Sequence, residues 1–208
     1  MTDHRPIVFL VDDDTGVLKA LTALLLTSGY DVRSFASSRE FLSQHDPSVS
    51  GCAVFDVAMP DLDGLELQAA LAEGNVERSV IFITGVGDIP TSVRAMKAGA
   101  IDFLTKPVSD EQLLDAIARA VQRDAGARKS HEELDLVKAR FAKLTPRECE
   151  VLTHVIAGKL NKQIAHELGT VVNTVKAHRG RAMKKLGAKS VAEVVRMAQR
   201  AGIRPANG

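Results

Sequence analysis

Five short strand-like segments alternate with helix-like segments in the first half of the chain, and this alternation restricts the fold more than any other feature. The first segment, residues 7–11, is a continuous apolar run, as expected for a parallel strand buried on both faces. The other predicted strands cover residues 31–35, 51–55, 79–84 and 100–104. Alternating strands and helices predict an α/β domain with a doubly wound, five-stranded parallel sheet.

The intervening segments repeat apolar residues at helical spacing, and glycines such as Gly29 and Gly74 follow them as helix stops. Ser109 and Gln112 have the spacing of a capping box, which predicts the start of the last helix of this domain. The earlier predicted helices cover residues 17–28, 38–44, 64–72 and 90–97.

Polar residues follow four of the predicted strands. Asp56 ends the third strand, and Pro60 shortly after it cannot continue a strand's hydrogen bonding. Asp12, Asp13 and Asp14 follow the first strand, Thr84 ends the fourth and Lys106 follows the fifth. A single aspartate at such a place is as readily a loop-capping group. Because ligands bind at the carboxyl ends of strands in open α/β sheets, the four ends together predict a site.

The chemistry of this site follows from its charges. Asp12, Asp13 and Asp56 crowd together unfavourably unless a cation neutralises them, and oxygen ligands suit Mg²⁺. With the metal bound, Asp56 can act as an oxygen nucleophile towards phosphorus and form an aspartyl phosphate. Thr84 and Lys106 would then bind phosphoryl oxygens. A cis Lys106–Pro107 bond, which would turn the lysine inward, is also expected.

The second half of the chain differs in charge. Residues 1–120 carry 18 acidic and 9 basic side chains, whereas residues 121–208 carry 8 acidic and 18 basic ones. This asymmetry suggests an acidic domain joined to a domain that meets a polyanion. Between them, residues 123–142 are predicted to form a linker that is partly helical.

The remainder of the chain is predicted to be all helical. Thr145 to Glu148 form a strong helix start, with Pro146 in the first turn. Asn161 is expected to cap a short second helix, a third helix covers about residues 173–186, and Ser190 with Glu193 forms a capping box for a fourth. The short helix, tight turn and basic helix have the proportions of a helix-turn-helix.

Other classes of protein are excluded by the composition. No apolar run approaches the roughly 20 residues of a membrane span, and the N-terminal residues are no signal peptide. The two cysteines, Cys52 and Cys149, lack metal-ligand spacing and are expected to be reduced. We therefore expect a cytoplasmic protein without membrane contact.

A set of motifs in residues 5–122 resembles the response-regulator receiver family, with its flavodoxin-like fold. The motifs are Val11-Asp12-Asp13-Asp14, Asp56 with Met59-Pro60, Asp63-Gly64, Thr84-Gly85, Lys97-Ala98-Gly99-Ala100 and Lys106-Pro107. The resemblance implies that Asp56 is the phosphoacceptor. It also implies that Mg²⁺ is held by Asp13, Asp56 and the main-chain carbonyl of Ala58, with Asp12 reaching the ion mainly through water.

The resemblance also implies roles for three further positions. Phe103 occupies the place of an aromatic switch residue that turns inward when Thr84 moves towards the phosphate; otherwise it is an ordinary core or surface aromatic. Ala58 and Val86 occupy positions that can orient a hydrolytic water in this family, and both are apolar here. We therefore hypothesise that the phosphoryl group is long-lived.

Residues 143–204 form the second predicted domain, and it resembles the LuxR-type helix-turn-helix of NarL/FixJ regulators, closest to FixJ-like proteins. The matching residues are Leu144 to Glu148, Gly158, Asn161 to Ala165, Leu168, Thr174 to Arg179 and Lys185 to Gly187, together with Ile83 to Pro90 of the receiver. The expected DNA contacts are Lys162, Asn173, Thr174, Lys176, His178, Arg179, Arg181, Lys184 and Lys185. His178 is equally placed to pack, and Arg181 is otherwise a solvated charge.

Two departures from the family concern the basic helix. The family usually caps this helix with Ser where the chain has Val171, so Asn173 is a candidate cap one or two residues later. That alternative would shift the register of the base-reading residues. Gly180 inside the helix costs roughly 1 kcal/mol relative to Ala.

The resemblances imply a two-component transcriptional regulator rather than an enzyme. A sensor histidine kinase would phosphorylate Asp56, and the face containing Val93, Lys97 and Asp102 would dimerise. The dimer would place two helices on double-stranded DNA half-sites about one helical turn apart and act on RNA polymerase. One alternative is a phosphatase with Asp56 as a transient nucleophile. The other is a phosphorylation-independent DNA-binding protein whose receiver is a scaffold.

Overall fold

The computed structural model describes residues 5–74, 77–85 and 88–206. The chain divides into two compact units, Met1–Arg128 and Lys129–Gly208. The boundary falls within the long helix α5 (Asp110–Ala142), so the stretch predicted as a partly helical linker, residues 123–142, lies within a helix.

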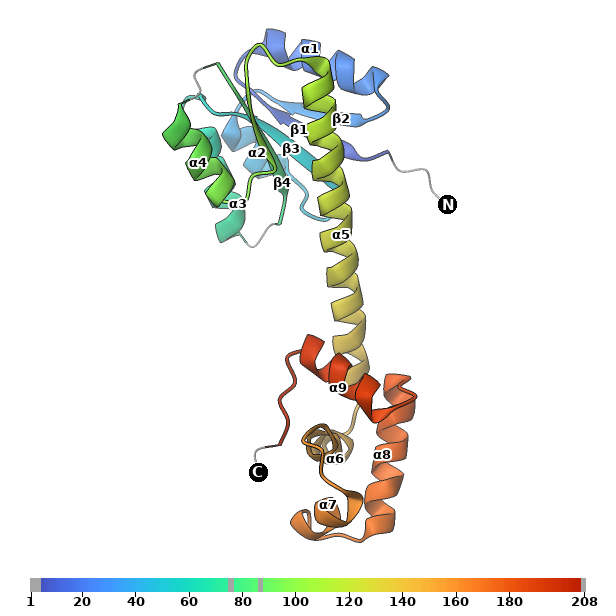
Figure 1. Cartoon of the computed structure of the whole chain (residues 1–208). Coiled ribbons are helices and arrows are strands. Elements are labelled where there is room, and N and C mark those ends of the chain that lie inside the picture. The colour runs from blue at the N-terminus through green and yellow to red at the C-terminus, as the bar shows by residue number, and fades with distance from the viewer. Residues whose placement is uncertain (1–4, 75–76, 86–87, 207–208) are drawn as a thin grey trace. The chain divides into compact units, whose positions relative to one another are not determined.

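The first unit contains a five-stranded parallel sheet in the order β2-β1-β3-β4-β5 (Figure 1). The strands are β1 (Ile7–Val11), β2 (Asp31–Phe35), β3 (Gly51–Asp56), β4 (Ser79–Thr84) and β5 (Asp102–Thr105). The predicted fold class is therefore confirmed. The fifth strand begins two residues later than predicted, because the amide of Ala100 bonds to the carbonyl of Ala95 at the end of the preceding helix.

Helices cover both faces of this sheet (Figure 1). The helices of the first unit besides α5 are α1 (Thr15–Thr27), α2 (Ser38–Gln44), α3 (Gly64–Glu73) and α4 (Ile89–Lys97). One apolar core packs α1 and α5 against the sheet through Leu25 and Ile117, and the other packs α2, α3 and α4 through Phe41, Leu67 and Ala95. All six residues of β3 are buried, so the continuous apolar run leads directly to Asp56.

Side-chain caps set the starts of α1 to α4, and two of these caps are aspartates of the receiver motifs. The carboxylate of Asp14 accepts hydrogen bonds from the amides of Gly16 and Val17, so α1 begins two residues earlier than predicted. Asp63 forms a reciprocal capping box with Glu66 at the start of α3. Both aspartates belong to the receiver motifs, but their side chains accept hydrogen bonds from backbone amides as helix caps.

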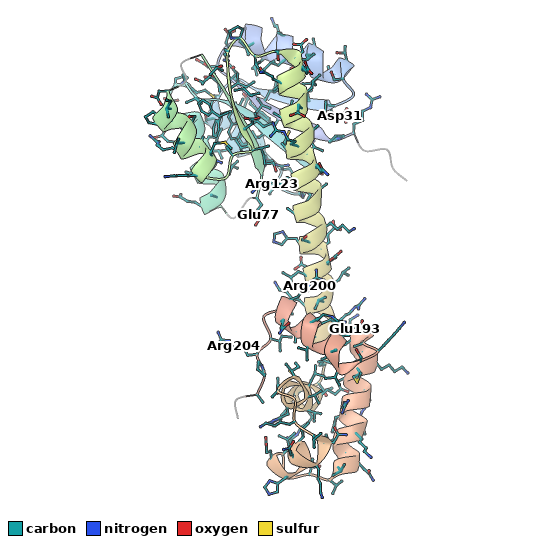
Figure 2. All side chains as sticks on the ribbon, viewed as in Figure 1. Asp31, Glu77, Arg123, Glu193, Arg200 and Arg204 are labelled. Atoms are coloured by element: carbon teal, nitrogen blue, oxygen red, sulfur yellow. The ribbon has the colours of Figure 1, made fainter. Side chains whose placement is uncertain are left out.

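The second unit is helical beyond α5. Its helices are α6 (Pro146–Ile156), α7 (Asn161–Glu167), α8 (Val172–Leu186) and α9 (Val191–Arg200). Figure 2 shows Glu193 and Arg200 on α9, and Arg200 pairs with Glu133 of α5 at 2.8 Å. Thr145 and Glu148 form the predicted capping box of α6.

Two predicted helix caps in this unit are wrong, and a third is confirmed only in part. Asn161 is the first residue of α7 and not its cap, because Leu160 occupies the cap position and Gln163 accepts a hydrogen bond from the Leu160 amide. Asn173 is likewise inside α8, whose N-cap is Val171. Ser190 caps α9 as predicted and accepts a hydrogen bond from the Glu193 amide at 3.2 Å, but the Glu193 carboxylate accepts from the amide of Lys189 and not from that of Ser190.

In the ranges that the structure describes, no helix is both long enough and apolar enough to cross a membrane.

Candidate functional site

The four polar strand ends meet at one edge of the sheet. Pairing of Asp56 with Ile83 and of Thr84 with Thr105 brings the carboxyl ends of β3, β4 and β5 level with one another. Pairing of Val11 with Phe55 does the same for β1, so Asp12 follows its strand at the same edge. Because these strands are parallel, the connections that leave β1, β3, β4 and β5 all start at this edge, at or next to one of these residues.

Lys106 joins the two buried carboxylates. Its Nζ lies 2.7 Å from Oδ2 of Asp12 and 2.8 Å from Oδ1 of Asp56. The two aspartates are only 5% and 6% exposed, whereas the lysine side chain is 27% exposed. Burial alone would lower the pKa of Lys106, but hydrogen bonds to Asp12 and Asp56 and their negative charges raise it above its ordinary value. The ammonium is therefore charged at neutral pH.

Backbone groups fix the second oxygen of each carboxylate. The amide of Ala58 donates to Oδ2 of Asp56 at 2.8 Å, and the amide of Asp14 donates to Oδ1 of Asp12 at 2.9 Å. The Lys106 amide donates to the Thr84 carbonyl at 2.7 Å, and the Lys106–Pro107 bond is cis, as predicted. Each acid is thus held between an ammonium and a main-chain N–H.

The remaining candidates around this site lie at different depths. Thr84 is completely buried, Asp13 is exposed, and Ala58 is exposed with its carbonyl on the loop after β3. The partly buried ring of Phe103 packs against Phe82, with ring centroids 6.2 Å apart. Val86 lies outside the described residues.

The donor set determines which metal could bind here. Within the described part of the chain, no three acidic, histidine or cysteine side chains are already arranged around a common metal position. Two buried carboxylates share one ammonium, so the pocket retains negative charge, and exposed Asp13 beside it adds more. All of these donors are oxygens, which fits a hard, hydrated cation such as Mg²⁺.

The expected DNA contacts fall into two groups by exposure. Asn173, Lys176, Arg181 and Lys184 are exposed, as is Lys162 at the start of α7. Thr174, His178 and Arg179 are partly buried; Arg179 donates to the side chain of Asn161 at 3.2 Å, and Arg181 contacts the His178 ring at 3.3 Å. The first turns of α8 therefore present both charged and neutral hydrogen-bonding groups.

Lys185 is not brought together with the other lysines. Its Nζ lies 2.6 Å from Glu148 and 3.1 Å from the carbonyl of Lys143. It lies nine residues after Lys176, about two and a half helical turns, and therefore on the opposite side of α8. Its hydrogen bond and that of the Thr145 amide lower the pKa of Glu148 to about 2.

The proposed dimer face on α4 contains more apolar surface than the sequence analysis recognised. Val93 is 44% exposed, and Ile89 and Met96, which precede and follow it at helical spacing, are 79% and 47% exposed. Lys97 is exposed, and Asp102 pairs with Arg119 at 2.5 Å. The spacing of these three apolar residues was visible in the sequence, but their shared exposure was not.

Comparisons with known proteins agree with this geometry. Residues 8–118 match the family model for the response regulator receiver domain, and residues 142–198 match that for bacterial regulatory proteins of the luxR family. The chain belongs to the response regulators. As a two-component response regulator with a LuxR-type DNA-binding domain, it joins a family of transcriptional regulators and not of enzymes.

The relatives extend along nearly the whole response regulator. Nodulation protein W of Bradyrhizobium diazoefficiens is 46% identical over 96% of this chain and 88% of its own length. The transcriptional regulatory protein FixJ of Rhizobium meliloti is 39% identical over 99% of this chain and 100% of its own. The solved structure of the response regulator StyR is 44% identical, covers 94% of this chain and 99% of its own, and superposes with a TM-score of 0.85.

Membership in the family has implications for the metal ion and for the partners. Receiver domains typically bind Mg²⁺ at their phosphorylation site, and the oxygen donors of this chain fit that ion. A receiver joined to a DNA-binding domain implies a kinase and DNA as partners.

Proposed function

We propose that Asp56 receives a phosphoryl group from the phosphohistidine of a sensor kinase. The observation that carries this proposal is the position of Lys106, which bonds to Asp12 and Asp56 at the carboxyl edge of the sheet. In the reaction, the P–N bond of the phosphohistidine breaks and an oxygen of Asp56 forms the new P–O bond. The Lys106 ammonium and the Thr84 hydroxyl then stabilise the charge on the phosphoryl oxygens.

Mg²⁺ would be held by Asp13, Asp56 and the Ala58 carbonyl, with Asp12 acting mainly through water. When bound, the ion supplies positive charge that reduces repulsion between the carboxylates and the incoming phosphoryl group. The protein's own part is orientation: the Ala58 amide holds one oxygen of Asp56, and Lys106 holds the other. Asp12 keeps the lysine in place.

The output of phosphorylation would be a dimer. Phe103, which packs at the edge of the core, would turn further inward as Thr84 moves towards the phosphate. The adjoining face contains Val93, Lys97 and Asp102, together with the exposed Ile89 and Met96. Apolar side chains at helical spacing and two charges suit a self-complementary interface.

The dimer would bind DNA in the cytoplasm and regulate transcription through RNA polymerase. Two copies of α8 would occupy major grooves of half-sites about one helical turn apart. Lys162, Arg181 and Lys184 would neutralise phosphates, while Asn173, Thr174, Lys176 and Arg179 would reach base edges. His178, in contact with Arg181, would support that phosphate contact.

The test is to treat the full chain with acetyl phosphate and Mg²⁺ and to measure its mass, oligomeric state and DNA binding. We expect one added phosphoryl group, a shift from monomer to dimer and tighter binding. Asp56→Asn should show none of these changes. Asp61→Asn is the matched control, because Asp61 has a φ of 69° and asparagine tolerates this left-handed conformation.

Two outcomes would contradict the proposal. Phosphorylation of Asp56→Asn to the wild-type extent would remove Asp56 as the acceptor. DNA binding that is already tight and indifferent to acetyl phosphate would support a receiver that serves as a scaffold. Loss of the phosphoryl group within seconds would separately refute the predicted long lifetime.

A further inference from the structure

Val171 is an exposed apolar side chain at a position where helices favour polar ones. It is the N-cap of α8, no side chain caps this helix, and 65% of the residue is exposed. Ser, Thr, Asp and Asn stabilise this position relative to apolar residues, because their side-chain oxygens accept from amides of the first turn. In the free protein, Val171 therefore provides neither a cap nor appreciable burial.

The neighbouring residues show that Val171 does not belong to the core. Val172, the next residue, is partly buried and packs against the cluster that contains Ile164 and Val175. The amides of Thr174 and Val175 bond to the Val171 carbonyl, which fixes its backbone at the first turn of the helix. The valine side chain is thus presented to solvent from a well-defined position.

Exposed polar and basic residues of α8 follow Val171 in the sequence. Asn173 and Lys176 are exposed on the first turns of α8, and Lys184 is exposed further along it. Residues 121–208 carry ten more basic than acidic side chains, which complements a polyanion. An exposed apolar group within such a surface has only one apolar partner on the base edges of the major groove, the 5-methyl group of thymine.

We propose that Val171 contacts the methyl group of a thymine in each half-site and thereby determines part of the sequence preference. The proposal rests on binding of α8 in the major groove, where the N-terminal residues of such a helix contact base edges. A serine at this position would cap the helix but would provide no apolar contact. Valine at this position thus leaves the helix without a side-chain cap but provides an apolar contact to one base.

The test begins with a DNA consensus obtained by in vitro selection with the phosphorylated full chain. Each thymine of the half-site is then replaced in turn by deoxyuridine, which lacks only the methyl group. At one position we expect about fourfold weaker binding of the wild type, the effect of losing one buried methyl contact. Val171→Ser should show less than 1.5-fold change at that position, and Val171→Ile should retain the wild-type response.

Two comparisons make the result specific. Leu136→Ser removes another exposed apolar side chain, 61% exposed on α5, and should leave the deoxyuridine response unchanged. Val171→Ser gains a side-chain cap, so weaker binding by this variant would not reflect loss of the fold.

The outcomes separate this inference from the proposed function. If the wild type and Val171→Ser respond equally to every deoxyuridine, the methyl contact is refuted although DNA binding stands. If the full chain selects no sequence, sequence-specific binding itself is refuted, and the inference with it.

Discussion

The receiver unit buries charge at both ends of its sheet, and the two ends are built differently. At the carboxyl ends, Asp12 and Asp56 share the single ammonium of Lys106. At the amino ends, before β3 and β4, the one carboxylate of Asp124 lies among the guanidinium groups of Arg78 and Arg128. The first cluster keeps excess negative charge, whereas the second has excess positive charge.

The positive cluster of Arg78, Arg128 and Asp124 is satisfied by hydrogen bonds, most of them to the backbone. Asp124 accepts bonds from Arg128 at 2.7 Å and from Ser50 and the Gly51 amide at 3.0 Å. The arginines donate to four carbonyls of the loop between α2 and β3, those of Asp46, Pro47, Ser48 and Val49, and to the carbonyl of Gly51 at the start of β3.

This difference separates a structural cluster from a cluster that we propose is reactive. In the amino-end cluster, carbonyl oxygens and Asp124 satisfy the guanidinium groups, and Arg78 also lies over the ring of Phe9. In the carboxyl-end cluster, the lysine is partly exposed, and the exposed Asp13 directly follows Asp12. Satisfied charge holds a fold together, and unsatisfied charge near solvent attracts a ligand.

The largest effect is expected from breaking the structural cluster. Asp124→Ala would leave Arg78, whose side chain is completely buried, without its counter-charge. Removing one partner of a buried ion pair costs about 3–5 kcal/mol in the free energy of unfolding. Urea unfolding of the receiver unit, followed by circular dichroism, measures this loss.

Asp115→Ala is the matched control on the same helix. Asp115 is 68% exposed and pairs with Arg119, so its loss should cost less than about 0.5 kcal/mol. Equal destabilisation by the two variants would show that burial does not distinguish these ion pairs, and the comparison would fail.

A smaller loss of stability is expected when the pH is lowered, and it arises at His45 beside the structural cluster. Burial and the positive charge of Arg78 lower the pKa of His45 to about 4, although nearby Asp46 opposes this and Arg128 adds to it. The unfolded chain, with a pKa near 6.5, then binds more protons than the folded protein between pH 6.5 and 4. His45 therefore contributes stability above about pH 6.5 that is lost as the pH falls towards 4.

The measurement is the unfolding free energy of the wild type and of His45→Gln at pH 7 and pH 4.5. Glutamine can still accept a hydrogen bond from Arg78, which now lies 2.9 Å from the histidine nitrogen. We expect the wild type to lose about 1–2 kcal/mol more than the variant, after allowance for partial exposure of the histidine. Parallel pH profiles would exclude His45 as the source.

The reactive cluster was predictable from the sequence, and the structural one was not. Asp56, Thr84 and Lys106 each follow a run of apolar residues, so their placement at one edge follows from strand periodicity and parallel topology. Arg78 and Asp124 are 46 residues apart, and nothing near either of them distinguishes it from a solvated charge. Only the packing of α5 against the sheet reveals that pair.

In the DNA-binding unit, the sequence did not show which of several nearby groups caps a helix or accepts a given hydrogen bond. Asn161 and Asn173 have the right chemistry for helix caps, but each lies one or two residues inside its helix. Lys185 is predicted to contact DNA, and the sequence does not show that Glu148, on another helix, bonds to it. The existence and order of the helices were predictable, because apolar periodicity fixes them more strongly than caps fix their ends.

Of the changes made in the two clusters, Asp56→Asn in the reactive cluster is expected to affect stability least. Asp56→Asn removes the Lys106 ion pair but also removes one of two buried negative charges, and its side-chain oxygen can still accept from the Ala58 amide. These changes oppose each other, so the unfolding free energy should change by less than about 1 kcal/mol while phosphorylation is abolished. Urea unfolding beside the acetyl phosphate assay measures both quantities on one sample. A loss of 3 kcal/mol or more would show that Asp56 is as structural as Asp124, and the contrast between the two ends of the sheet would disappear.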